Sequence, residues 1–286
     1  MLGFKAKQKY KMGENQVISV LGCGWLGLPL AEQLVRSGYT VKGSTTSPEK
    51  LELLQQKGIE PYLLNLSGEN QQIHSINQFL EADVLVLNIP PKLRSDGGKG
   101  YLQQMHTLVK ALLESSITRI LFVSSTSVYQ DLNRIVTEED ISFTDELEPD
   151  NMLLQAERLF QEREDFVTTI VRFGGLVGGD RHPGRFLAGK KHLPNGDAPV
   201  NMIHLDDCVA ILSRIIEQDK WGQVYNACAD SHPLRKDFFP KAAENLGLAP
   251  PEFDDMKETR FKLIKSQKMK DDLAYVFLHP DPMFFF

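Results

Sequence analysis

Three glycines near the beginning of the chain have the spacing of a nucleotide-binding turn. Gly22, Gly24 and Gly27 follow the apolar run VISVL and precede an amphipathic stretch that predicts a helix. In a strand-turn-helix unit the first glycine permits the tight turn, the second lets a pyrophosphate approach the backbone, and the third lets the helix pack closely on the strand. The first amides of such a helix can bind phosphate oxygens. With Trp25 and Leu26 between its glycines, the motif predicts a dinucleotide site; a merely tight turn is the alternative.

The residues after the second predicted strand bear on which dinucleotide binds. In proteins that select NAD, an acidic side chain about 20 residues past the glycines holds the ribose 2′-hydroxyl. This chain has the run VKGSTTS there, with no carboxylate. The hydroxyl groups of Ser44, Thr45 and Thr46, with Lys42 and Lys50 nearby, would accept a 2′-phosphate. We therefore expect NADP, and NAD stays the alternative because the run contains no arginine.

A regular alternation of apolar runs and amphipathic stretches must position these residues. Strands are predicted at Val17 to Leu21, Tyr39 to Lys42, Tyr62 to Leu66, Val84 to Ile89, Ile120 to Val123, Thr168 to Phe173 and near Gln223 to Ala227. Helices are predicted at Leu26 to Arg36, Pro48 to Lys57, Tyr101 to Ser115, Asn151 to Arg163 and near Asp206 to Glu217. Such alternation produces βαβ units, and continuously apolar strands are typical of a sheet covered on both faces. The expected fold class is α/β, a Rossmann-type doubly wound parallel sheet with a smaller C-terminal substrate lobe.

The pattern becomes less regular in the last third of the chain, which suggests the domain organisation. Residues 17–180 are predicted to form the dinucleotide-binding Rossmann domain. Residues 181–286, which begin in a stretch rich in Gly, Pro and Arg, are predicted to form mainly the substrate lobe. A helix and a strand within 203–228 are expected to return to the Rossmann core. Residues 1–16 are expected to be a disordered leader, with a misassigned start as the alternative.

Composition excludes several classes of protein. The 286 residues are 42% hydrophobic and 24% charged with a net charge of −6, as in ordinary globular proteins, and this charge gives no bulk attraction to nucleic acid. The three cysteines have neither a disulfide-framework nor a zinc-type spacing, and the seven histidines form no helical i,i+4 pair, so no metal site is expected. No segment has the roughly 20 apolar residues of a membrane span. We expect a cytoplasmic protein that binds a small-molecule substrate and neither nucleic acid nor membrane; a homodimer is compatible with the sequence.

Six stretches of the sequence together resemble a known family. They are GCGWLGLPLA, LFVSSTSVY, VRFGGLVGGDRHPGRFLAGK, NMIHLDDCVAIL, GQVYNACAD and the late PDP. From about Val17 onwards, nearly the whole chain resembles the extended short-chain dehydrogenase/reductase superfamily. It is most similar to the atypical YeeZ-like branch, whose members are described as nucleoside-diphosphate-sugar epimerase-like. The resemblance is specific for the family and does not define a substrate.

Typical members of this superfamily use a Ser or Thr at the end of the fifth strand together with a Tyr-x-x-x-Lys pair on the next helix. The Lys and the cofactor ribose lower the pKa of the Tyr, which exchanges a proton with the substrate as hydride moves. The resemblance places Ser125 at the serine position. Counting back from Glu157, which matches the family helix, puts Leu153 where Lys is expected and Pro149 where Tyr is expected. Because this pair is missing, ordinary carbonyl reduction is not expected. Tyr129 is a substitute acid in one interpretation and a structural tyrosine in the other.

The resemblance also implies substrate-binding residues in the C-terminal part. It places Arg181, His182 and Arg185 in a loop over the substrate cleft, where arginine suits a phosphate or carboxylate; a solvated basic loop is the alternative. Asn201 and His204 are expected at the mouth of the cleft, with a structural, hydrogen-bonded role as the alternative for His204.

Two functions follow from these expectations. The first is an NAD(P)-dependent oxidoreductase or epimerase-like enzyme that acts on a phosphorylated or nucleotide-linked small molecule. The second is a non-catalytic dinucleotide-binding or regulatory protein that has lost the Tyr-x-x-x-Lys pair. The glycine motif supports both, and the missing pair separates them.

Overall fold

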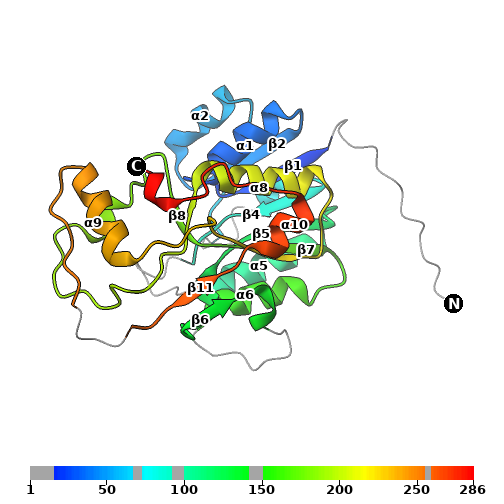
Figure 1. Ribbon diagram of the computed structural model, residues 1–286. Helices are drawn as coiled ribbons and strands as arrows, with labels where there is room; N and C mark the ends of the chain where they lie inside the picture. Colours follow the sequence, from blue (N-terminus) through cyan, green and yellow to red (C-terminus); the bar gives the residue numbers. More distant parts are fainter. Residues whose placement is uncertain (1–15, 67–72, 92–99, 142–150, 255–258) are drawn as a thin grey trace.

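A seven-stranded parallel sheet forms the centre of the computed structural model (Figure 1), which describes residues 16–66, 73–91, 100–141, 151–254 and 259–286. Its strands run in the order β10-β7-β5-β4-β1-β2-β3. They are β1 (Val17–Leu21), β2 (Thr40–Thr45), β3 (Glu60–Leu63), β4 (Val84–Leu87), β5 (Arg119–Ser125), β7 (Val167–Phe173) and β10 (Val224–Ala227). All six neighbouring pairs are parallel, which confirms the predicted Rossmann-type sheet.

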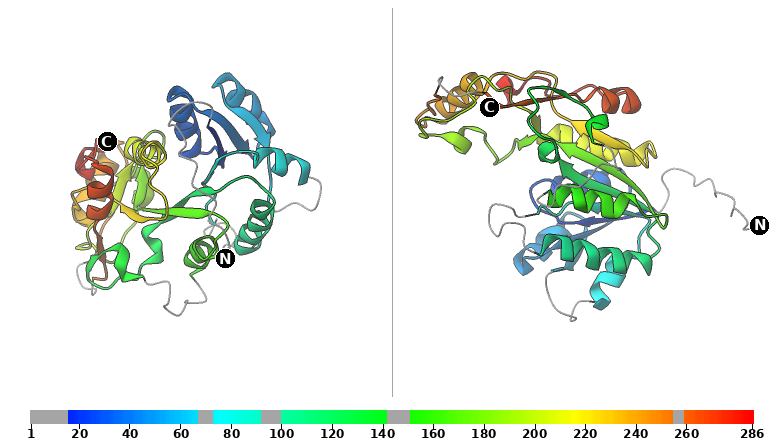
Figure 2. Two further views of the ribbon diagram at one scale, coloured as in Figure 1. Left: turned by 90° about the vertical axis from the view of Figure 1, so that its right-hand side faces the viewer. Right: turned by 90° about the horizontal axis from the view of Figure 1, so that it is seen from below.

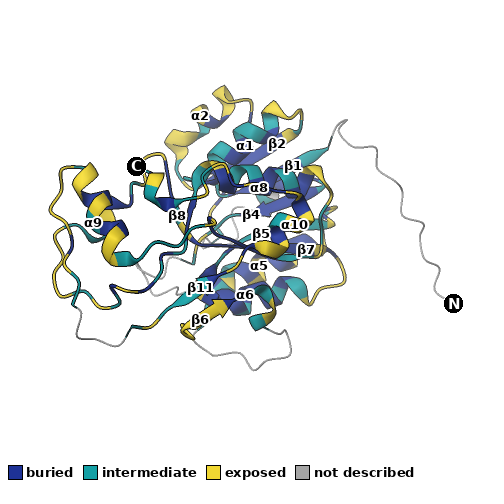
Figure 3. Ribbon diagram, in the orientation of Figure 1, coloured by how far each residue is buried: buried dark blue, intermediate teal, exposed yellow. Residues whose placement is uncertain are grey.

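Helices cover both faces of this sheet, and its central strands are buried between them (Figure 3). On one face lie α1 (Gly27–Arg36), α2 (Leu51–Gln56), α8 (Leu205–Glu217) and α10 (Gln267–Leu273). On the other lie α3 (Ile73–Phe79), α5 (Tyr101–Leu113) and α6 (Met152–Gln161). β4 is buried along its whole length, as its continuous apolar run predicted. Within the described ranges, no helix has the length and apolarity needed to cross a membrane.

The predicted elements differ from the observed ones mainly at their ends. β2 continues three residues beyond its predicted end at Lys42. The predicted helix from Pro48 is divided into a 3₁₀ turn, η1 (Pro48–Lys50), and α2, a common arrangement at a helix N-terminus. α3 was not predicted. The expected leader 1–16 lies, except for its last residue, outside the described residues.

Mostly short elements lie outside the main sheet and its covering helices. Two pairs of three-residue strands lie outside the main sheet, β6 (Arg134–Val136) with β11 (Lys262–Ile264), and β8 (Gly175–Val177) with β9 (Met202–His204). The remaining helical elements are η2 (Thr126–Val128), η3 (Glu138–Asp140), α7 (Gly184–Leu187), α9 (Arg235–Asn245) and η4 (Pro282–Phe284). A separate apolar cluster with Phe238, Phe239 and Phe285 at its centre joins α9 to the C-terminal segment at one end of the molecule (Figure 2).

Candidate functional site

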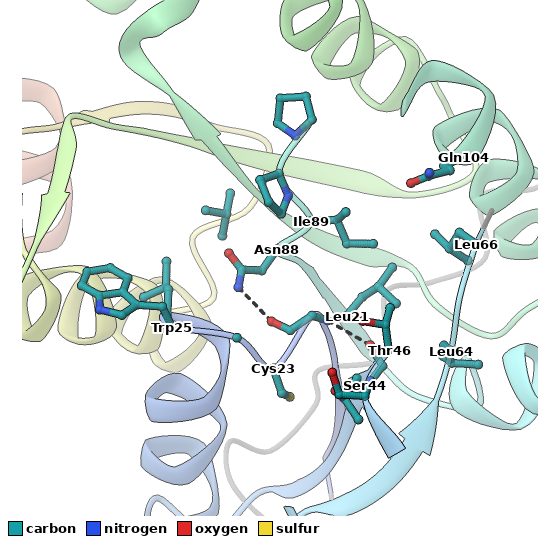
Figure 4. Close-up of a pocket in the computed structure, with 18 of the residues that line it drawn as sticks. Leu21, Cys23, Trp25, Ser44, Thr46, Leu64, Leu66, Asn88, Ile89 and Gln104 are labelled. Atoms are coloured by element: carbon teal, nitrogen blue, oxygen red, sulfur yellow. Dashed lines mark hydrogen bonds between the residues drawn. The ribbon is translucent and has the colours of Figure 1, made fainter. Parts of the chain in front are cut away.

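A cleft of about 440 Å³ opens where several strands of the main sheet end (Figure 4). Five of the segments that line it follow or end β1, β2, β3, β4 and β5, namely Leu21–Leu26, Ser44–Ser47, Leu64–Leu66, Asn88–Pro91 and Val123–Ser125. The neighbours of β1 are β2 on one side and β4 on the other, so the chain reverses its winding direction here. Doubly wound sheets bind ligands in the crevice at this switch point.

The three glycines of the motif differ in what surrounds them, and each environment fits the role expected of it. Gly22 has φ +103°, and a Cβ there would lie 2.6 Å from the Asn88 carbonyl oxygen. A Cβ on Gly27 would collide with the Gly22 carbonyl oxygen, so only glycine lets α1 begin this close to the turn. A Cβ on Gly24 would meet no atom within 4 Å. The backbone at Gly24 is therefore open on the side where a pyrophosphate would approach, and the loop fits a dinucleotide.

Two side chains hold this loop in place (Figure 4). The Ser44 hydroxyl accepts a hydrogen bond of 2.9 Å from the Gly22 amide, and the Asn88 side-chain amide donates one of 3.0 Å to the Gly22 carbonyl. Ser44 therefore supports the turn, and it also lines the cleft in which it was predicted to contact the cofactor. Asn88 was missed, and a polar residue at the end of an apolar run was the available signal. Burial raises the pKa of the Cys23 thiol to about 12, so Cys23 stays neutral in the lining.

Residues predicted to meet the cofactor ribose separate into two groups. Thr46 and Lys50 are exposed and line the cleft. Thr45 also lines it, but its hydroxyl accepts a hydrogen bond of 3.1 Å from the Ser47 amide. Lys42 does not line the cleft, because its buried ammonium donates to the carbonyls of Gln78 and Glu81 at the end of α3. The described residues of the lining include no carboxylate.

Ser125 and Leu153 lie in the part of the cleft that β5 and α6 form. The Ser125 hydroxyl accepts a hydrogen bond of 3.1 Å from the Ser127 amide, and it can still donate its own proton. Leu153 lines the cleft with only 7% of its surface exposed. The helix position that the family resemblance assigns to Lys thus faces the cleft and is apolar. Pro149 lies outside the described residues.

Tyr129 lies in the protein interior and is not among the residues that line the cleft. Its hydroxyl donates to the Asn226 side-chain oxygen over 2.8 Å and accepts from an Arg172 Nη over 2.7 Å. Burial raises the pKa of Tyr129 to about 12. The structure therefore does not bring Tyr129 together with Ser125, and the tyrosine proton is held by Asn226.

Arg172 continues this network toward α6. Its guanidinium forms an ion pair of 2.6 Å with Glu157, and both side chains are fully buried. Ser124, which lines the cleft, donates its hydroxyl proton to the same carboxylate. A chain of hydrogen bonds thus runs from the edge of the cleft through Glu157 and Arg172 to Tyr129, and Glu157 has a structural partner on each side.

The three predicted residues of the basic loop point in different directions. Arg181 lines the cleft, and its guanidinium lies 4.7 Å from the centre of the Trp25 ring, a cation–π contact. His182 accepts a hydrogen bond from the Gly184 amide and lies 5.7 Å from the Phe286 ring, toward the C-terminal segment. Arg185 is exposed on α7. Only Arg181 of the three reaches the cleft.

Asn201 and His204 also lie outside the cleft lining. The Asn201 side chain donates to the carbonyl of Lys262 and accepts from the amide of Ile264, and in this way holds β11. The His204 Nδ1 accepts a hydrogen bond of 3.3 Å from the Asp206 amide and so caps α8. The described contacts of both residues are structural.

Comparison with known proteins places this site in a family. A family model described as NAD(P)H-binding matches residues 22–217. The protein YeeZ of Escherichia coli strain K12 is 36% identical over 275 residues, which cover 93% of this chain and 97% of YeeZ.

Solved structures share the fold over almost the whole chain. A functionally unknown conserved protein from Silicibacter pomeroyi superposes with a TM-score of 0.73 at 21% identity and covers 94% of this chain and 96% of its own. MoeE5, solved in complex with UDP-glucose and NAD, superposes with a TM-score of 0.70 at 19% identity and covers 91% and 93%.

Proposed function

This chain belongs to the NAD(P)H-binding family, and from that premise we propose that it is an epimerase-like protein that binds NADP and acts on a phosphorylated or nucleotide-linked small molecule. The observation that carries cofactor binding is the open backbone at Gly24 within a crevice at the switch point of the sheet. The choice of NADP over NAD is supported by Thr46 and Lys50, which line the cleft where a selective carboxylate would otherwise be expected.

In this proposal, each part of the cleft binds a different part of the cofactor. Residues 22–27 would hold the pyrophosphate, Thr46 and Lys50 the 2′-phosphate, and the Ser125 end of the cleft the nicotinamide. When bound, the nicotinamide supplies hydride transfer. The chain itself would orient the substrate with the Ser125 hydroxyl and shield it with Leu153.

Arg181 supports the proposed class of substrate. Its guanidinium lies in the cleft lining and would pair with a phosphate or carboxylate. Of the other predicted substrate residues, His182 and Arg185 remain proposals on the adjoining loop and helix, beside the cleft rather than in it. A nucleotide-linked sugar is consistent with MoeE5, whose complex contains UDP-glucose.

A specific observation favours the alternative of a non-catalytic binding protein. Among the described residues of the lining there is no Asp, Glu, His or Tyr, the side chains that most often exchange a proton with a substrate. With Leu153 in the lysine position, the described part of the cleft lacks the usual proton donor. A regulatory protein that senses the cofactor would need only the binding half of the site.

The proposal also includes the cellular compartment and the binding partners of the protein. A net charge of −6 supports a protein that binds neither nucleic acid nor an anionic membrane surface. The three cysteines are buried and unpaired, which supports a reducing compartment and hence the cytoplasm. A homodimer stays part of the proposal, and sedimentation analysis of the purified chain tests it.

Cofactor binding is tested by calorimetric titration with NADP, NADPH, NAD and NADH on wild type, Gly24→Val and Thr107→Val. Thr107 lies on the exposed surface of α5, outside the cleft, so its variant controls for a valine substituted away from the site. We expect saturable binding by wild type and Thr107→Val, tighter for the NADP forms, and none by Gly24→Val. Equal binding by all three proteins contradicts the site, and a preference for NAD contradicts the cofactor choice alone.

A further inference from the structure

Three metal-ligating side chains meet outside the cofactor cleft. His204 ends β9, Asp206 lies in the first turn of α8, and His279 lies in the segment that follows α10. The Asp206 Oδ2 is 3.1 Å from the His279 Nε2 and 3.4 Å from the His204 Nδ1. All three ligand atoms lie within 4.8 Å of one another, and none of the three residues lines the cleft.

The neighbouring Asp207 fixes the geometry of this cluster. Its carboxylate is fully buried and accepts hydrogen bonds from the amides of Leu278 and His279, at 2.7 and 3.1 Å, and from the Tyr275 hydroxyl at 2.7 Å. Asp207 therefore joins the C-terminal segment to α8 directly beside the cluster. The backbone at His279 is held in place by contacts that a metal ion would not disturb.

Packing also keeps the two imidazole rings in place. The His204 and His279 rings lie 3.9 Å apart between their centres, and the Phe285 ring contacts both at 5.5 and 6.2 Å. The His204 Nδ1 accepts a long hydrogen bond of 3.3 Å from the Asp206 amide, and a metal ion bound at this atom would replace that bond.

Two histidine nitrogens and one carboxylate oxygen are a common ligand set for zinc. Zinc bonds of about 2.0 to 2.2 Å in a tetrahedral arrangement separate the ligand atoms by roughly 3.3 Å. The two separations given above, 3.1 and 3.4 Å, lie on either side of this value. Asp206 is 58% exposed, so the cluster is open to solvent for entry of an ion and for a water as fourth ligand.

We propose that His204, Asp206 and His279 bind one zinc-class divalent metal ion, which fastens the C-terminal segment to α8. The sequence could not indicate this site, because His279 is far from the other two ligands along the chain and no two histidines have helical spacing. The site does not depend on the proposed cofactor or substrate, since it lies outside the cleft.

The test uses tag-free protein that has been treated with a chelator, and titrates it with zinc chloride alone in a calorimeter. We expect one equivalent to bind and the melting temperature to rise with the zinc concentration, because the ion binds only the folded chain. His279→Ala and Asp206→Asn should each weaken binding at least about tenfold. These variants are preferred to His204→Ala because the His204 ring also caps α8.

Two controls make the result specific. His106→Ala removes an exposed histidine from α5, on the opposite side of the sheet, and should bind zinc like wild type. Magnesium, which prefers oxygen ligands, should produce no saturable signal. Failure of the wild type to bind zinc stoichiometrically overturns the proposal, and so does equal binding by His279→Ala, Asp206→Asn and His106→Ala.

Discussion

The guanidinium of Arg172 and the carboxylate of Glu157 form an ion pair with no exposure to solvent, between β7 and α6. Removal of one partner leaves the other charge buried and unpaired, which costs about 3–5 kcal/mol in comparable cases. We therefore expect Arg172→Met to lower the free energy of unfolding by about this amount in urea denaturation. The double variant Arg172→Met with Glu157→Leu should recover part of the loss.

The exposed pair Arg36 and Glu32 provides the control for this prediction. Its side chains are 63% and 24% exposed, and pairs of this kind contribute at most about 1 kcal/mol. Arg36→Met should therefore change the free energy of unfolding much less than Arg172→Met. A similar decrease in the free energy of unfolding in Arg36→Met and Arg172→Met would contradict the prediction that burial makes the Arg172 ion pair costly to break.

Alanine substitutions at Gly24 and at Gly27 should differ in their effect on stability. Gly24→Ala places a methyl group in open space and should leave stability unchanged, whereas Gly27→Ala forces the methyl group against the Gly22 carbonyl and should lower the melting temperature. Thermal unfolding without cofactor measures both. Equal melting temperatures would mean that α1 can move away from the turn at little cost.

Lys50 should contribute to the binding of NADP and not to the binding of NAD. An exposed ion pair contributes up to about 1 kcal/mol, so Lys50→Ala should weaken NADP binding by about two- to fivefold and leave NAD binding unchanged. The matched control is Lys57→Ala, because Lys57 is exposed at the end of α2 but does not line the cleft. An equal loss for NAD and NADP in Lys50→Ala would place Lys50 away from the 2′-phosphate.

Ser125 and Tyr129 should be distinguishable by what their variants lose. Tyr129→Phe removes the hydroxyl that accepts from an Arg172 Nη and donates to the Asn226 side-chain oxygen, and should lower stability by about 1–3 kcal/mol, with cofactor affinity unchanged. Ser125→Ala should preserve stability and slow any turnover of nucleotide-linked sugars. Unfolding, calorimetry and cofactor absorbance measure these three quantities. If Tyr129→Phe had normal stability but no turnover, Tyr129 would have a role in the reaction, which contradicts this prediction.

His232 should make stability depend on pH. Burial lowers the pKa of His232 below its ordinary value of 6.5, and its Nδ1 lies 3.0 Å from the Val200 carbonyl. The unfolded chain therefore takes up a proton at a higher pH than the folded chain, so stability falls as pH decreases below about 6.5. Melting temperatures between pH 8 and pH 5 should fall less steeply for His232→Asn than for wild type. Parallel curves would contradict the lowered pKa.

The main sheet could be predicted from the sequence because its central strands, β1, β4 and β5, are mostly apolar. Runs such as VLVL in β4 need no knowledge of partners distant in sequence. The glycine motif is equally local. In contrast, β6 and β11 are only three residues each and pair across more than a hundred residues, so no local pattern identifies them.

The glycine turn of the candidate site could be predicted because it is formed by residues adjacent in sequence. The positions of side chains that depend on where a strand ends, or on contacts with distant segments, could not. Lys42 was expected beside the ribose because β2 was predicted to end there. β2 continues to Thr45, so Lys42 lies within the strand and contacts the end of α3. The burial of Tyr129 depends on Arg172 and Asn226, which lie on two other strands.

Trp25, at the cleft and in contact with Arg181, gives the protein a built-in optical reporter. The chain has only two tryptophans, and the other, Trp221, lies near Arg119 away from the cleft. A Trp221→Phe protein would therefore emit from Trp25 alone. Any ligand that displaces the Arg181 guanidinium from the indole ring, or accepts its excitation energy as a reduced nicotinamide does, will change that fluorescence. Occupancy of the cleft can thus be followed in real time without a label.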